Sequence, residues 1–87
     1  MKKINNKKNA FGELIKYHRN KLKLSRADVS RELDLINIPI SPDELYRMET
    51  HNLSIKDFEL VALCSILNIN FNDLNSFLKD TQNRVES

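Results

Sequence analysis

The chain has 87 residues, of which 40% are apolar and 30% are charged. This length allows a single domain, and the balance is typical of a soluble globular protein rather than a disordered chain. No apolar run is long enough to span a bilayer, and the N-terminal residues lack the apolar segment of a secretory signal, so we expect a cytoplasmic protein without membrane contact.

The charge is unevenly distributed. Residues 1–31 carry ten Lys or Arg and two acidic residues, a net +8, whereas residues 32–87 carry four Lys or Arg and ten acidic residues, a net −6. A basic N-terminal half fits a polyanionic partner such as nucleic acid. The alternative is that the two halves neutralise each other in the folded chain, and charge alone does not decide between them.

One Gly and two Pro leave few helix breakers, which favours an all-α fold. Apolar residues at three- and four-residue steps predict five helices, at 10–22, 26–34, 42–50, 55–67 and 71–79. The predicted domain therefore covers residues 9–79, with a disordered basic arm at 1–8 and a disordered tail at 80–87.

Several helix starts carry capping signals. Three serines each stand three residues before an acidic residue, which is the capping-box spacing; they are Ser25, Ser41 and Ser54. Ser41 has the strongest signal because Pro42 occupies the first helical position, where its missing N–H costs nothing. Asn9 and Asn70 are candidate caps for the first and last helices.

The apolar stripe of the last predicted helix is either a dimer surface or part of the core; its members are Phe71, Leu74, Phe77 and Leu78. Cys64 is the one cysteine, and its apolar surroundings favour a buried hydrophobe over a reactive thiol. His18, on the apolar face of the first helix, is interpreted as partly buried rather than as a pH switch.

No pattern of catalytic residues is present. The sequence contains no Ser/His/Asp or Cys/His constellation, no Gly-rich phosphate loop, and its histidines and cysteine are scattered over separate elements. We therefore expect no enzymatic activity, no metal and no cofactor.

The order of the predicted helices and their sequence motifs resembles the phage-repressor-like (Cro/repressor, or xenobiotic-response-element) helix-turn-helix family. The resemblance spans residues 11–78 and rests on five stretches in the right order: 11–19, 24–33, 40–49, 57–67 and 70–74. It implies a five-helix, lambda-repressor-like fold in which the helix beginning at Pro42 is the recognition helix. It also implies that Arg19 pairs with Glu49 to align that helix, and that Arg26 contacts a phosphate.

The residues of the predicted recognition helix agree with this geometry. If Leu45 and Met48 face the core, the opposite stripe carries Asp43, Tyr46, Arg47 and Thr50. Arg47 suits guanine or a phosphate, and Asp43 suits the amino group of cytosine, although a merely solvated helix face has the same spacing. The candidate DNA-binding residues are Arg26, Ser41, Asp43, Glu44, Tyr46, Arg47, Asn52 and Lys56.

Three features depart from the family pattern. Residues 35–39 lengthen the turn before the recognition helix by about five residues, and the isoleucines at 36, 38 and 40 suggest that this turn packs on the core. The recognition helix is acidic. His51 replaces the Gly that closes this helix in many relatives, which leaves Asn52 as the candidate left-handed residue and Lys56 as the one nearby cation.

The sequence therefore predicts a DNA-binding transcriptional regulator, a repressor, that acts on double-stranded DNA as a homodimer. The acidic helix and the missing basic loop motivate an alternative from another class. In that alternative the fold has exchanged DNA for a protein partner and serves as an antirepressor or as one half of a heterodimer.

Overall fold

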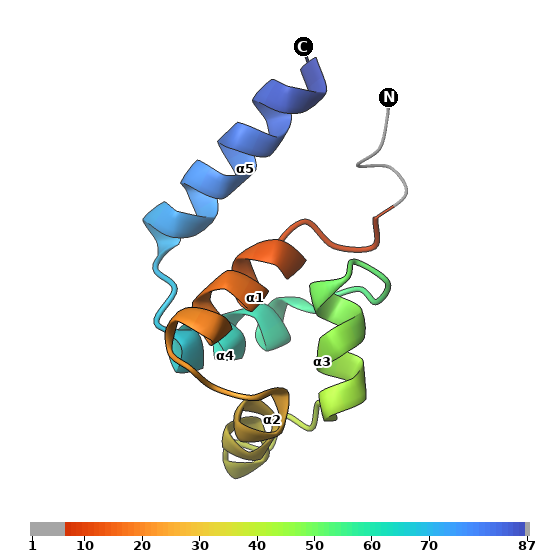
Figure 1. The fold of residues 1–87 in the computed structure, drawn as a ribbon, viewed down its shortest axis with the longest axis vertical. Helices are drawn as coiled ribbons and strands as arrows, with labels where there is room; N and C mark the ends of the chain where they lie inside the picture. The colour runs from red at the N-terminus through yellow and green to blue at the C-terminus, as the bar shows by residue number, and fades with distance from the viewer. Residues whose placement is uncertain (1–6, 87) are drawn as a thin grey trace.

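The computed structural model describes residues 7–86, with side chains described for residues 7–79. Five α-helices follow one another: α1 Gly12–Lys21, α2 Arg26–Leu35, α3 Pro42–Glu49, α4 Asp57–Leu67 and α5 Phe71–Glu86 (Figure 1). The described residues contain no strand, so the all-α prediction is confirmed. In this part of the chain no helix combines the length and apolarity needed to cross a membrane.

Helices α1 to α4 form the body of the molecule around one core. The main contacts between helices join α1 with α3, α1 with α4, α2 with α3 and α2 with α4. Among the described residues, the buried apolar side chains are Ile15, Val29, Leu33, Ile40, Leu45, Met48, Ala62, Leu63, Leu67 and Ile69. Because each of the four helices places residues in this cluster, burial of apolar surface joins them into a single unit.

Helix α5 leaves this body and projects outward (Figure 1). Leu74 packs against the core, and the ring of Phe77 lies 6.1 Å from that of Phe11. Phe71, by contrast, is 76% exposed. The stripe that was open to two interpretations is therefore divided between contacts within the chain and exposed surface.

Local capping explains most helix starts. The hydroxyls of Ser25 and Ser41 accept from the backbone N–H of the residue three positions later, and that residue's carboxylate accepts in return. Asn9 Oδ1 accepts from Gly12 N at 2.8 Å, and Asn70 Oδ1 accepts from the N–H of α5's third residue at 2.8 Å. The predicted caps at Ser25, Ser41 and Asn70 are confirmed; Asn9 accepts from the first N–H of α1, but the N-cap position itself is Phe11. The prediction for Ser54 is wrong, because α4 begins only at Asp57.

Two other sequence predictions need correction. Helix α5 runs to Glu86 instead of ending at 79, so residues 80–86 are helical rather than a disordered tail. The apolar stripe ends at Leu78, but no Gly or Pro follows to stop the helix. At the other end of the chain, the N–H of Lys8 donates to the carbonyl of His51 at 3.0 Å, so this arm residue is bonded to the body. The rest of the predicted arm, residues 1–6, and Ser87 lie outside the described residues.

Each of the first four helices is closed by a non-glycine residue in the left-handed region. These residues are Lys23, Asn37, His51 and Asn68, with φ between 60° and 66°. In each case the next residue's N–H donates to a carbonyl five residues back, which satisfies a group at the helix end. His51, and not Asn52 as predicted, closes α3.

The lengthened turn between α2 and α3 packs only in part. Ile40 is buried and its carbonyl accepts from the Ser30 hydroxyl at 2.7 Å, while Ile38 packs against the edge of the core. Ile36 is half-exposed, contrary to prediction, and its neighbour Leu35 is 73% exposed. Asn37, with its left-handed backbone at φ 63°, lies between Ile36 and Ile38, so Ile36 does not share a face with Ile38 and Ile40 as it would in a continuous extended segment.

Candidate nucleic-acid interface

Helix α3 has an inner face that is locked in place and an outer face that is open. Leu45, Met48 and Glu49 are buried, whereas Asp43 and Arg47 are exposed. The i, i+4 spacing places Asp43 and Arg47 on the same side of the helix. Neither side chain makes a hydrogen bond or an ion pair among the described residues. Both remain available to a ligand.

A buried ion pair holds the inner face of α3 to α1. The Glu49 carboxylate is fully buried and accepts from Arg19 Nε at 2.7 Å and from Arg19 Nη2 at 3.1 Å. Arg19 Nη1 also donates to the carbonyl of Leu24 at 2.9 Å, at the start of the segment that leads into α2. The predicted Arg19–Glu49 pair is present. Through Arg19 it joins α1 to α3 and to the segment that leads into α2.

Arg26 also binds Glu49, which the sequence did not predict. Its Nε and Nη2 lie 3.1 Å and 3.0 Å from Glu49 Oε1, and its guanidinium carbon lies 4.9 Å from the centre of the Tyr46 ring. Arg26 and Glu49 are 23 residues apart, and no local pattern in the sequence links them. The structure thus brings together four residues of the candidate site: Arg19, Arg26, Tyr46 and Glu49.

The remaining candidates are distributed around the two ends of α3. Ser41 and Glu44 cap its start, with the Glu44 carboxylate accepting from the Ser41 N–H at 2.9 Å. Asn52 follows its end and donates from Nδ2 to the hydroxyl of Thr50 at 3.1 Å. Lys56 is exposed, and its ammonium has no partner among the described residues. Capping therefore occupies Ser41 and Glu44, whereas Lys56 remains available.

The segment before α1 packs against the end of α3 through contacts that the sequence did not predict. Asn9 Nδ2 donates to the carbonyls of Met48 at 2.9 Å and Leu53 at 2.8 Å, and the His51 ring nitrogen Nδ1 lies 3.1 Å from the Asn9 carbonyl. Asn9 was expected only as a cap. Together these bonds hold the segment just before α1 against the end of α3 (Figure 1).

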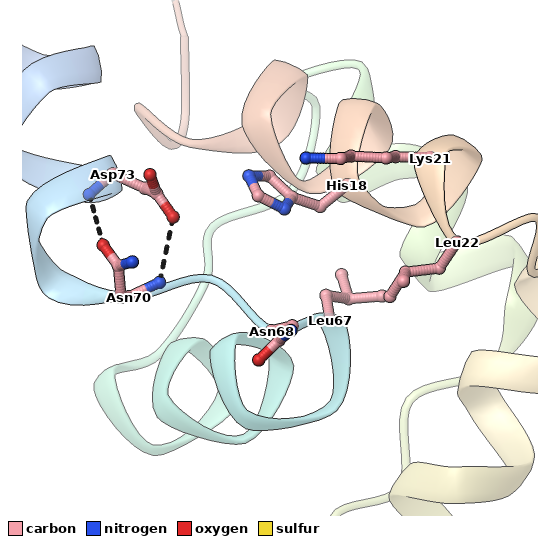
Figure 2. Close-up of a pocket in the computed structure, with 7 residues that line it drawn as sticks. All are labelled: His18, Lys21, Leu22, Leu67, Asn68, Asn70 and Asp73. Carbon is pink, nitrogen blue, oxygen red and sulfur yellow. Dashed lines mark hydrogen bonds between the residues drawn. The ribbon is translucent and has the colours of Figure 1, made fainter.

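A cavity of about 310 Å³, open to solvent, lies where the ends of α1 and α4 meet the start of α5 (Figure 2). It is lined by His18, Lys21, Leu22, Leu67, Asn68, Asn70 and Asp73. Asn70 and Asp73 are hydrogen-bonded to each other in capping α5, as the dashed lines in Figure 2 show. His18 is half-buried, as predicted. Two of the polar side chains that line this cavity, Asn70 and Asp73, are therefore already engaged in capping α5.

The described residues give no sign of metal or thiol chemistry. They contain no group of three or more His, Cys, Asp or Glu side chains placed to hold a metal ion. Burial, and then the nearby carboxylate of Asp73, raise the pKa of the Cys64 thiol. A raised pKa disfavours the reactive thiolate at neutral pH, as the interpretation of Cys64 as a hydrophobe requires.

No family model, no curated protein and no solved structure matches this chain.

Proposed function

We propose that the chain is a sequence-specific DNA-binding regulator in which α2 and α3 form a helix-turn-helix of the phage-repressor type with a lengthened turn. The observation that carries this proposal is the two-sided character of α3. Its inner face is held by the buried carboxylate of Glu49, while Asp43 and Arg47 on its outer face are exposed and unpaired. A rigid helix with free polar side chains is what reading the major groove requires.

In this proposal the residues divide into positioning contacts and base contacts. Arg26, Lys56 and the basic N-terminal residues approach the phosphates, and the α3 start at Ser41 sets the depth of the helix in the groove. Arg47 donates to guanine O6 and N7, and Asp43 accepts from a cytosine amino group. The protein acts in the cytoplasm as a repressor, without catalysis or cofactor.

One helix reads few base pairs, so the proposal includes a homodimer. Phe71, 76% exposed, offers the most surface of the α5 stripe to a second copy, and Leu78 is half-buried like Leu74 and Phe77. Leu74 and Phe77 already contact the body of their own chain. A dimer with two-fold symmetry would contact half-sites about 34 Å apart, one turn of duplex.

The test is selection of the purified chain against a random pool of duplex DNA at near-physiological salt. We expect an enriched, two-fold symmetric motif. Arg47→Ala should then cost about 1–3 kcal/mol of binding and relax the preference at one base pair. Lys79→Ala, which removes an exposed cation on α5, is the matched control and should leave the motif unchanged. A flat pool would contradict the proposal.

The acidic start of α3 favours one alternative, in which this surface binds a protein. Asp43 and Glu44 both lie in its first turn, where they would meet the phosphates of DNA. Asp43→Lys separates the two proposals. If α3 reads bases, this variant loses its specific site; if α3 has exchanged DNA for a protein, it gains general affinity for DNA. An unchanged affinity for both ligands would mean that this face is not the binding surface.

A further inference from the structure

The guanidinium of Arg26 contacts an aromatic ring and, along one edge, a carboxylate. Its carbon lies over the Tyr46 ring, 4.9 Å from the ring centre. Its Nε and Nη2, which form one edge, lie 3.1 Å and 3.0 Å from Glu49 Oε1. Since the two contacts come from successive turns of α3, the side chain is fixed relative to that helix.

The second edge of this guanidinium is free. A guanidinium presents five N–H donors, and Nη1 with the other N–H of Nη2 forms an outer edge that fits two oxygens of a phosphate. Within residues 7–79, Nη1 of Arg26 has no hydrogen-bond partner, and the side chain is 32% exposed. The arrangement leaves a paired donor edge open to solvent beside α3.

The charge around Glu49 is not balanced. One carboxylate serves two guanidinium groups, those of Arg19 and Arg26, so the cluster carries an excess positive charge. Arg19 is only 8% exposed and uses all three of its nitrogens within the chain. The excess charge is therefore presented through Arg26, and an anion at its outer edge would neutralise it.

We propose that Tyr46 is a positioning residue that holds the free edge of Arg26 toward a phosphodiester of the DNA backbone, rather than a residue that reads a base. This inference rests on the proposed DNA-binding function and gives a specific task to Tyr46, which the sequence placed only among the candidate DNA-binding residues. Fixing an arginine before binding reduces the conformational entropy lost on contact with phosphate. The attraction comes from the face of the ring, so the Tyr46 hydroxyl is not needed.

The experiment measures binding of the full chain to the duplex recovered by random-pool selection and to an unrelated duplex of equal length, between about 50 and 200 mM salt. Tyr46→Phe should leave affinity, salt dependence and the selected motif unchanged. Tyr46→Leu should weaken binding to both duplexes equally, by about three- to tenfold, and lower the salt slope by up to about one, as Arg26→Gln also does. Because the effect passes through Arg26, the double variant should be no weaker than Arg26→Gln alone.

Two controls keep this test independent of folding. Tyr17→Leu removes a comparably exposed tyrosine that lies under Lys21 Nζ at 6.0 Å on α1, and should change nothing. Urea midpoints should agree among the Tyr46 variants, since Tyr46 is 49% exposed. A motif altered by Tyr46→Phe, or additive losses from Tyr46→Leu and Arg26→Gln, would overturn the inference while leaving DNA binding intact. Failure of the unaltered chain to bind either duplex would instead overturn the proposed function and this inference with it.

Discussion

Replacing Glu49 with alanine is expected to lower the free energy of unfolding by about 3–5 kcal/mol. The carboxylate is fully buried and pairs with Arg19, whose side chain is 8% exposed. Its removal leaves the Arg19 guanidinium in the interior with no counter-charge, and this penalty exceeds the loss of the hydrogen bonds themselves. A domain of this size has a total stability on the order of 10 kcal/mol or less, so urea denaturation will resolve the change.

The matched control removes both buried charges together. Arg19→Met combined with Glu49→Leu fills a similar volume with apolar groups, and buried pairs replaced in this way often lose little stability. We expect the double variant to recover most of what Glu49→Ala loses. If Glu49→Ala costs less than about 1 kcal/mol, Arg19 has found water or another partner, and the pair is not what holds α1 to α3.

Gly12→Ala is expected to destabilise the chain by about 2 kcal/mol, although alanine favours helices by about 1 kcal/mol over glycine. A Cβ atom at this position would lie 2.3 Å from the Met48 carbonyl oxygen and 2.9 Å from that of Glu49. Both obstacles are backbone atoms at the end of α3, and Asn9 Nδ2 holds the first of them at 2.9 Å. Helix α1 must therefore move away from α3.

Asn20→Ala is the control for this experiment, because Asn20 is exposed on the same helix. It should leave stability unchanged or raise it by a few tenths of a kcal/mol. Urea midpoints of the two variants give the comparison directly. A Gly12→Ala chain as stable as the Asn20→Ala chain would show that α1 and α3 separate without cost.

Predictions from local chemistry were accurate where a short stretch of sequence contains all the interacting groups. Ser25 and Ser41 cap their helices because the serine hydroxyl and the acid three residues later satisfy each other's backbone N–H groups. The same spacing failed at Ser54, where Glu59 instead accepts from the N–H of Lys56 at 2.8 Å and α4 starts later. Two overlapping capping patterns compete there, and the sequence does not rank them.

Two features of the candidate site could be predicted: the buried and exposed faces of α3, and the Arg19–Glu49 ion pair. Leu45 and Met48 are buried and Asp43 and Arg47 are exposed, as the helical period predicts. The Arg19–Glu49 pair was expected from the family resemblance alone, since nothing in the local sequence links residues 30 positions apart. The tasks assigned to the exposed residues stay predictions until DNA binding is measured.

By itself, the sequence determined the five helices, most of their starts and the face that α3 buries, because these depend on groups within one or two helical turns. Only the tertiary structure decided that Arg26 joins Glu49 and covers Tyr46, and that Asn9 spans the gap from α1 to the end of α3. It also decided which residues of the α5 stripe contact the body: Leu74 and Phe77 do, whereas Phe71 remains exposed. Each of these outcomes depends on the distance between segments far apart in the chain, and that distance is set only when the whole core packs.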